Sequence, residues 1–449
     1  MCVDINSAMG LNAMETGLVI SGSNQGCEPA FVRWSVVALM VSFSVMNYFD
    51  RTIIAIAGPG IMQEYRLTET QMGSIYSAFL LGYALFMIPG GYLADRYGPR
   101  AVVTVMGLGA ALSTGLTGFG GRPGLGAYLG IVPAFAVIRF GMGAFTAPLY
   151  PACGATNANW FPLGRRALVW GLVAGGAGLG GAIAPPIFSR TIERFGWRQS
   201  FWLAGAATAL LALIWLWYVR DHPSEHPSLR RQGAGEAPAP RPAGSDPQTG
   251  SASWRRLLTN RNMALLSFGY LTAGYFEYIF FYWIYYYFGQ IRRLPAAETT
   301  LYTTLIFVSW TVMTPLGGAI SDRLVKRYGK KRGRRIVPIV SLTAAALCLG
   351  VGASIANAAL AAGVMALALG LASCSDGPFW ACAIDIGDGN AGAACGILNT
   401  GGNIGGTVCP VLTPFIASFA GWSVALYFGC LVAILGVSIW FFVDTTGPE

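Results

Sequence analysis

The sequence predicts an all-α membrane protein whose twelve transmembrane helices form two pseudo-symmetric bundles of six. Of its 449 residues, 54% are hydrophobic and only 11% are charged, whereas soluble proteins carry about 25% charged residues. Twelve apolar segments are each long enough to cross a bilayer, which takes about 20 residues. A polar, proline-rich stretch separates the first six from the last six. This composition excludes a soluble enzyme, a nucleic-acid-binding protein and a disordered chain.

The apolar segments define the domain organisation. In chain order they cover 32–57, 71–94, 101–120, 126–158, 167–189, 199–219, 261–288, 299–321, 336–355, 357–384, 391–418 and 421–443. They predict an N-terminal six-helix bundle over 31–220 and a C-terminal six-helix bundle over 259–443. We expect 1–30 to form a cytoplasmic N-terminal tail, 221–258 a flexible cytoplasmic linker and 444–449 a cytoplasmic C-terminal tail, because these stretches have too few apolar residues to bury a core.

The positions of the basic residues orient the chain in its membrane. Cytoplasmic loops carry an excess of Lys and Arg, and placing both termini in the cytoplasm puts about 20 of the 29 basic residues there. From Asp322 to Arg335 the chain has eight basic residues against one acid. We interpret this cluster as a topology signal and not as a nucleic-acid site. The prediction is a multi-pass protein in the lipid bilayer of the inner (plasma) membrane.

The two halves repeat one motif at the same place. "GGYLADRYGPR" (90–100) follows the second apolar segment, and "GGAISDRLVKRYGKKRGRR" (317–335) follows the eighth. Asp95 and Asp322 are 227 positions apart, and an Arg follows each. Two six-helix halves related by a parallel repeat are typical of secondary transporters that work by alternating access.

The motif identifies a resemblance to a known family. The pattern G-x-L-A-D-R-x-G-x-R at Gly91–Arg100 resembles the loop signature of the major facilitator superfamily. Within it, "NYFDRTIIAIAGPGI" (47–61) and "NTGGNIGG" (399–406) resemble the anion:cation symporter family, which includes galactonate, glucarate, hexuronate, sialic-acid and phosphate carriers. The resemblance implies the major facilitator fold. It also implies a monomeric, proton-coupled symporter of a small organic anion, a sugar acid or related carboxylate, with no cofactor besides the coupling protons.

Charged residues of the repeated loops are candidates for gating. A carboxylate there can accept hydrogen bonds at a helix N-terminus, and the Arg that follows can pair across the interface between the halves. Such contacts could hold the cytoplasmic side closed. The alternative is a charged loop that only sets topology. The candidate gating residues are Asp95, Arg96, Arg100, Asp322 and Arg323.

Three further charges lie inside predicted membrane helices. Asp50 and Arg51 are adjacent in the first apolar segment, and Arg139 lies in the middle of the fourth. A charge at the centre of a spanning helix costs roughly 2.5–3.5 kcal/mol on insertion scales, so such residues usually face a polar cavity. The family resemblance implies that Arg51 and Arg139 bind the substrate carboxylate and that Asp50 binds a proton. The alternative is a structural ion pair between the two segments.

Polar and aromatic residues in the predicted helices complete the candidate binding site. They would offer hydroxyl, ring and amide contacts to a hydroxylated ligand, although such residues also serve in packing. The candidates are Tyr48, Tyr83, Trp380, Asn399 and Asn403. Asp376, in "CSDGPFW", is deep enough in its segment to line the same cavity.

The sequence departs from the family at one acid. Family members usually carry a Glu seven residues after the Arg of the fourth segment, where this chain has Thr146. Glu277 lies in the seventh segment, 227 positions after Asp50, which is the offset of the repeated loop motif. We therefore hypothesise that Asp50 and Glu277 together bind the coupling protons. The alternative is that neighbouring Tyr hydroxyls satisfy Glu277.

Other functions are left open by the sequence. The protein could be a facilitator or exporter of another small solute, or a receptor that binds without transport. The two histidines, His222 and His226, lie in the polar middle of the chain, so no histidine within the membrane could build a metal site or a catalytic centre. We therefore expect neither a metal site nor an enzyme. The glycine-rich run 171–186 predicts close helix packing; Gly176 stands where exporters have the Pro of a glycine-proline signature.

Overall fold

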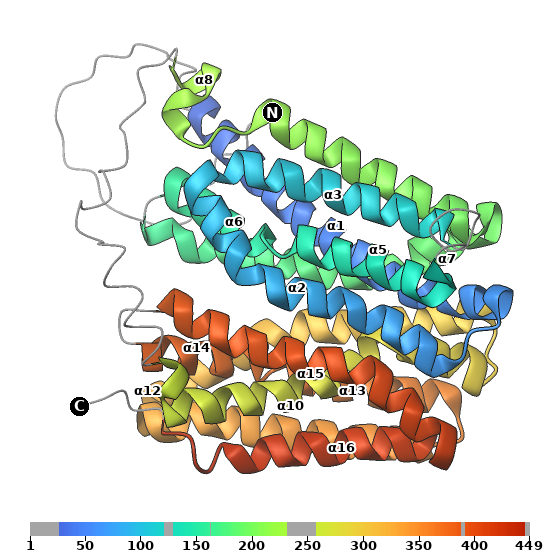
Figure 1. Cartoon of the computed structure of the whole chain (residues 1–449). Coiled ribbons are helices and arrows are strands. Elements are labelled where there is room, and N and C mark those ends of the chain that lie inside the picture. Colours follow the sequence, from blue (N-terminus) through green and yellow to red (C-terminus); the bar gives the residue numbers. More distant parts are fainter. Residues whose placement is uncertain (1–26, 121–128, 162, 231–256, 388–390, 445–449) are drawn as a thin grey trace.

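The computed structural model describes residues 27–120, 129–161, 163–230, 257–387 and 391–444, which are mostly helical (Figure 1). The helices of the first half are α1 (Cys27–Tyr65), α2 (Glu69–Tyr97), α3 (Pro99–Phe119), α5 (Ile131–Thr146), α6 (Leu149–Trp160) and α7 (Leu163–Tyr218). Those of the second half are α10 (Arg261–Tyr282), α11 (Ile284–Tyr286), η4 (Tyr287–Ile291), α12 (Ala296–Ser354), α13 (Ala358–Ser373), α14 (Asp376–Gly387), α15 (Ala391–Ala420) and α16 (Trp422–Ile439).

Within the described residues these helices make twelve membrane crossings. Eight helical segments are long and apolar enough to span a bilayer. Two of them, α7 and α12, are 56 and 59 residues long and turn back at Gly196 and Gly329. The φ angles of these glycines are 80° and 78°, a backbone region that residues with a Cβ rarely adopt. Each of the two long helices therefore crosses twice, and α2 and α10, whose tyrosines and charged residues lower their hydropathy, complete the twelve.

A backbone repeat relates the two halves. Arg66 and Arg293, which are 227 positions apart, are the non-glycine residues with positive φ in the described chain, at 53° and 56°. Each lies in the turn after the first crossing of its half. The fourth crossing breaks between α5 and α6, and the tenth breaks at the matching positions between α13 and α14. The offset found in the loop motif thus also relates the backbones of the two halves.

The polar middle of the chain is more ordered than the sequence predicts. Residues Pro223–Glu225 (η3) and Pro227–Arg230 (α8) form short helices against the first half. The His226 ring lies 6.2 Å from the Trp160 ring and 5.1 Å from the Tyr218 ring, centre to centre. Burial, together with nearby Arg220, lowers the pKa of His226. Residues 221–230 of the expected linker therefore pack against the first half, and 231–256 lie outside the described residues.

Two boundaries also differ from the expected ones. The helix α1 begins at Cys27, so the last four residues of the expected N-terminal tail are helical. The basic stretch between the eighth and ninth apolar segments lies inside α12 and not in an extended loop. Residues 1–26 and 445–449, which hold most of the two expected tails, lie outside the described residues.

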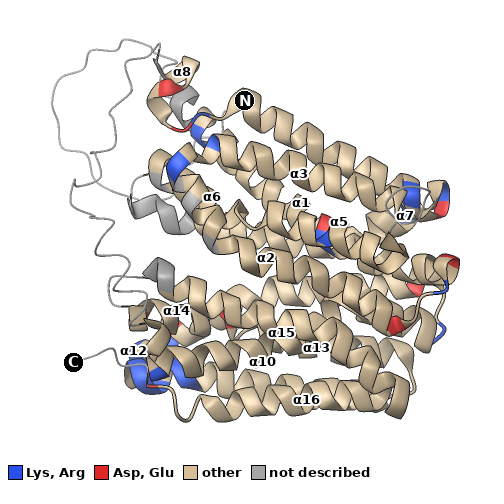
Figure 2. Cartoon of the chain, viewed as in Figure 1, with Lys and Arg blue, Asp and Glu red and all other residues tan. Residues whose placement is uncertain are grey.

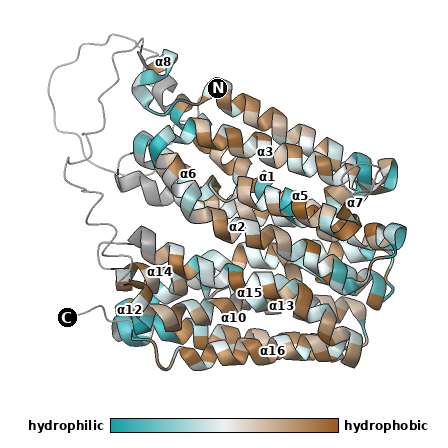
Figure 3. Cartoon of the chain, viewed as in Figure 1, coloured by the Kyte–Doolittle hydropathy of each residue, from teal (hydrophilic) through white to brown (hydrophobic). Residues whose placement is uncertain are grey.

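Charged residues lie mostly at the two ends of the bundle (Figure 2), whereas apolar residues predominate along its outer helices, as a lipid-facing surface requires (Figure 3). We call the end where α7 stops and α10 starts the linker end, and the opposite one the far end.

Between the halves, α2 packs on α15 and α7 on α12. Gly176 and Gly180 of the glycine-rich run contact α1, and Gly178 and Gly181 contact α12. The run therefore serves close helix packing.

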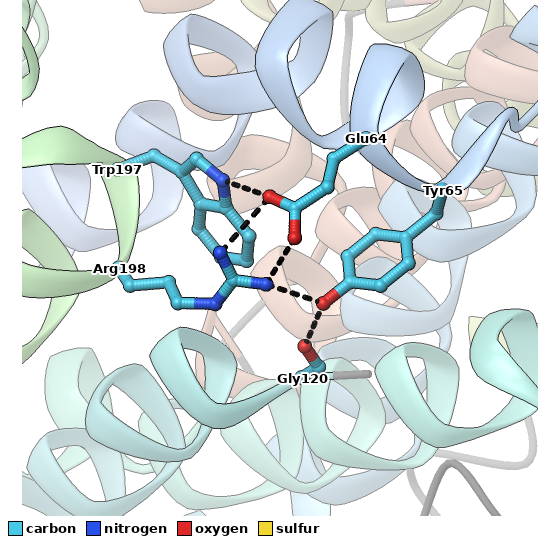
Figure 4. A network of polar contacts seen from close by, with 5 residues as sticks. All are labelled: Glu64, Tyr65, Gly120, Trp197 and Arg198. Atoms are coloured by element: carbon cyan, nitrogen blue, oxygen red, sulfur yellow. Dashed lines mark hydrogen bonds and ion pairs between the residues drawn. The ribbon is translucent and has the colours of Figure 1, made fainter. Parts of the chain in front are cut away.

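A network of polar contacts ties three helices together at the far end of the first half (Figure 4). Arg198 of α7 donates hydrogen bonds to both carboxylate oxygens of Glu64 and, at 2.7 Å, to the Tyr65 hydroxyl of α1. The indole Nε1 of Trp197 donates to Glu64 at 2.9 Å. The Tyr65 hydroxyl donates to the carbonyl oxygen of Gly120, just after α3, at 2.6 Å.

We expect Arg198→Ala to lower the thermal unfolding midpoint of the purified protein. The change removes a bidentate pair with a partly exposed carboxylate, which is worth about 1 kcal/mol. The matched control is Arg194→Ala, since Arg194 is an exposed residue one turn earlier. Equal midpoints for the two variants would show that the network contributes nothing to stability.

Candidate functional site

A cavity of about 360 Å³ lies between the two halves. Its wall is largely aromatic, with tyrosine, tryptophan and phenylalanine side chains from both halves. The charged residues that line it are Arg51 from the first half and Glu277 and Asp376 from the second. The volume suits a small molecule, and the polar groups are few and face one another.

Arg51 provides the positive charge of the cavity. Its side chain is buried in α1 and donates a hydrogen bond to the hydroxyl of Tyr278 in α10. The centre of the guanidinium lies 4.8 Å from the Tyr278 ring, 5.2 Å from the Phe79 ring and 5.8 Å from the Tyr83 ring. Its Nε has no hydrogen-bond partner. Among the described residues, no acid forms an ion pair with Arg51. Aromatic rings and the hydroxyl groups of Tyr278 and Tyr282 surround this cation.

Arg139 and Asp50 lie apart from the residues that line the cavity. Arg139 of α5 is fully buried, and its Nη1 donates to the sulfur of Met142 at 2.9 Å. Asp50 is buried as well and accepts a hydrogen bond from the Thr208 hydroxyl of α7 at 2.8 Å. The two charges are within electrostatic range of each other. Among the described residues that line the cavity, Arg51 is therefore present without Asp50 or Arg139. The guanidinium groups of Arg51 and Arg139 nevertheless lie over the same Phe79 ring, 5.2 Å and 4.9 Å from its centre.

The second half contributes two carboxyl groups to the cavity. Glu277 lies in α10, and Asp376 begins α14, directly after the break in the tenth crossing. One oxygen of each carboxyl is buried without a hydrogen-bond partner. At the position of the missing family acid, the Thr146 hydroxyl is turned back to the carbonyl oxygen of Met142, at 2.8 Å. The acids that line the cavity thus come from the opposite half.

The uncharged residues predicted for the site, Tyr48, Tyr83, Trp380, Asn399 and Asn403, all line the cavity. Asn403 donates to the Asn399 carbonyl oxygen at 2.9 Å, and Trp380 Nε1 donates to the Tyr270 hydroxyl at 3.2 Å.

Sequence reasoning missed Tyr278, Tyr270 and Trp310, which line the same cavity. The internal repeat could have identified two of them, Tyr278 and Trp310. The offset of 227 that relates Asp95 to Asp322 also relates Arg51 to Tyr278, and Tyr83 to Trp310. Matching positions of the two halves thus meet at the centre of the molecule.

Three of the candidate gating residues, Arg96, Arg100 and Asp322, make contacts within their own halves. Arg100 donates through Nη2 to the carbonyl oxygen of Leu216 at 2.7 Å, and its backbone N–H donates to Asp221 at 2.8 Å. Asp322 forms an ion pair with Arg334 at 2.8 Å. The Arg96 guanidinium lies 5.4 Å from the centre of the Tyr97 ring. Arg323 is exposed, and the side chain of Asp95 lies outside the described residues.

Several polar contacts between the halves lie toward the far end. The Tyr286 hydroxyl of α11 donates to the Glu69 carboxylate of α2 at 2.6 Å. The Ser77 hydroxyl of α2 donates to the carbonyl oxygen of Thr407 in α15 at 2.5 Å. A Cβ at Gly73, between these contacts, would collide with the backbone of Pro410. The halves are therefore in direct contact on the far-end side of the cavity.

We expect Gly73→Val to hold the far end open, because the added side chain cannot fit between α2 and α15. Spin labels on cysteines at 66 and 293, in the far-end turns of the two halves, would report a longer distance than in the unsubstituted protein. Gly115→Val is the control, since nothing lies within 4 Å of a Cβ at that position. An unchanged label distance in Gly73→Val would contradict this packing.

A helical chain that crosses the membrane twelve times, in two repeated halves around a central cavity, has the architecture of a membrane transporter. The chain belongs to the Major Facilitator Superfamily, whose family model matches residues 40–394. This membership confirms the predicted family and fold class and agrees with the expectation that the protein is not an enzyme.

Curated relatives span nearly the whole chain. It is 30% identical to a probable sulfoacetate transporter of Cupriavidus necator, over 90% of this chain and 92% of that one. It is 28% identical to the hexuronate transporter of Bacillus subtilis, over 86% and 88%. Among solved structures, a bacterial homologue of the human lysosomal transporter Spinster matches with a TM-score of 0.73 at 16% identity, over 93% of this chain and 97% of that one. This structural similarity shows the fold alone.

Proposed function

We propose that the protein is a secondary active transporter that carries a small organic anion, a sugar acid or related carboxylate, together with protons. The observation that carries this proposal is Arg51, a buried cation that faces the cavity without an acid partner. An unpaired charge within the membrane is costly, and a carboxylate ligand would neutralise it through two parallel hydrogen bonds. The names of the relatives support an anion, since they include sulfoacetate and hexuronate transporters.

The remaining lining residues suit the rest of such a ligand. The amide groups of Asn399 and Asn403 would bind hydroxyl groups, and the rings of Tyr48 and Trp310 would contact the carbon skeleton. Because Arg51 is hydrogen-bonded to Tyr278 of the other half, an anion on Arg51 would bind both halves at once. This arrangement suits alternating access, in which two halves rock around a central site.

The orientation and the conformation belong to the same proposal. The excess of basic residues supports an orientation with the linker end in the cytoplasm, in a cell whose inner membrane holds the protein. With the halves in contact on the far-end side, the structure would correspond to an inward-facing state. Both halves of one chain complete the cavity, so a monomer would be sufficient for transport. No cofactor besides the coupling protons is required.

Uptake into proteoliposomes tests this function. Labelled hexuronate, aldarate and sulfoacetate are offered with and without an acidic exterior. The proposal predicts saturable uptake of at least one carboxylate, accelerated by the proton gradient. Uptake of a neutral solute alone, or flux only outward, would instead indicate a facilitator or an exporter. Ligand-induced thermal stabilisation without flux would indicate a receptor.

A further inference from the structure

The charge of the cavity raises a problem for an anion carrier. Arg51 contributes one positive charge, and Glu277 and Asp376 together contribute two negative charges when both are ionised. A ligand anion would then enter a cavity that is already net negative and whose wall is largely aromatic. Such charges are costly in a low-dielectric site. Anion binding at Arg51 therefore requires that the carboxyl groups be neutralised.

The two carboxyl groups are placed to act together. They line the same cavity from α10 and α14 and are within electrostatic range of each other. Each has one buried oxygen with no hydrogen-bond partner. The Tyr270 hydroxyl contacts Asp376 and receives the indole N–H of Trp380. The other titratable or charged groups around the pair, from all elements that line the cavity, are Arg51, Tyr48, Tyr83, Tyr150, Tyr278 and Cys374.

None of these neighbours supplies a second positive charge. Of the described residues that line the cavity, Arg51 is the one cation, and it already donates to Tyr278. The ring hydroxyls are neutral hydrogen-bonding groups. Neutralisation of the two acids must therefore come from bound protons or from a cation that enters with the substrate.

We propose that Glu277 and Asp376 form the proton-binding site of the transporter. Asp376 would then take the place of the family acid whose position Thr146 occupies. Two carboxyls in one site resist double ionisation, so they hold one proton between them. With that proton and Arg51, the empty cavity is neutral. When a monoanion binds Arg51, a second proton restores neutrality. Both states that must reorient are thus uncharged, and one proton moves with each monoanion.

This inference rests on the proposed anion transport, and two assays separate the two claims. The full-length protein is placed in proteoliposomes with a labelled monocarboxylate that it transports. The first assay measures accumulation driven by an acidic exterior, and the second measures exchange of label at equal pH on both sides. If no carboxylate moves in either assay, the proposed function fails. If the label exchanges but substitution of Glu277 and Asp376 leaves accumulation unchanged, only the present inference fails.

The expected results follow from the stoichiometry. One proton per monoanion lets a gradient of one pH unit drive about tenfold accumulation, since one pH unit corresponds to 1.36 kcal/mol. The double variant Glu277→Gln, Asp376→Asn should abolish this accumulation while exchange remains measurable, because no carboxyl is then left in the cavity to take up the proton that accompanies the anion. Glu298→Gln, which removes an exposed acid in the first turn of α12, is the matched control and should behave like the unsubstituted protein.

Tenfold accumulation by this double variant would overturn the proposal. So would accumulation that follows a sodium gradient and not the proton gradient, or loss of accumulation confined to Asp50→Asn. If the double variant loses exchange as well, Glu277→Asp and Asp376→Glu decide the matter. They keep the carboxyl group and should restore proton-driven accumulation. Failure of these conservative variants in folded protein would assign the pair a structural role and overturn the proposal.

Discussion

Arg51→Gln should weaken carboxylate binding by about thirtyfold to several thousandfold. Removing one partner of a buried, hydrogen-bonded charge pair costs about 2–5 kcal/mol, and every 1.4 kcal/mol is a factor of ten. Arg51→Lys should recover little, because an ammonium cannot form the two parallel hydrogen bonds of a guanidinium. Thermal stabilisation by the transported carboxylate, titrated over its concentration, measures both effects.

Two controls separate this role from a general effect of charge or packing. Arg190→Gln removes an exposed arginine of the same half and should leave affinity unchanged. Tyr278→Phe removes the hydroxyl that receives the Arg51 hydrogen bond and keeps the cation, so its effect should be smaller than that of Arg51→Gln. An affinity within twofold of the unsubstituted protein in Arg51→Gln would remove the basis for the proposed anion site.

Arg139→Met should destabilise the protein strongly without acting on the ligand directly. The substitution would leave the Asp50 carboxyl buried without a nearby cation, and breaking a buried pair in this way costs about 3–5 kcal/mol. The double variant Asp50→Asn, Arg139→Met removes both charges and should recover much of the loss. The thermal unfolding midpoint and the monodisperse fraction in size-exclusion chromatography report the outcome for the singles and the double.

A different outcome would restore the role that the family resemblance implies. If Arg139→Met folds like the unsubstituted protein and loses carboxylate affinity as Arg51→Gln does, then Arg139 reaches the ligand in another conformation. A double variant no more stable than the single would likewise show that Asp50 and Arg139 do not stabilise each other.

Most of the fold could be predicted from the sequence because the membrane imposes simple rules. Spanning helices need long apolar segments, and the segments and their polar connections are visible in the composition. The repeated loop motif gave the offset between the halves. The order of 221–230 could not be predicted in this way, because it depends on His226 meeting two aromatic rings of helices distant in sequence.

Several residues that line the cavity could be named from the sequence, but their arrangement could not. Asp50 and Arg51 are neighbours in α1, and successive residues of a helix point about 100° apart. Which of them faces the cavity depends on packing against other helices, and in the structure Arg51 lines the cavity. The pairing of Glu277 with Asp376 depends on the break in the helix before α14. The geometry of that break cannot be read from amino-acid composition.

The most direct test of the central claim is an experimental structure of the protein with a transported carboxylate bound. We expect the ligand in the cavity between the halves, with its carboxylate oxygens about 2.8 Å from the guanidinium nitrogens of Arg51. A ligand bound outside this cavity, or one inside it whose carboxylate lies away from Arg51, would contradict the proposed anion site.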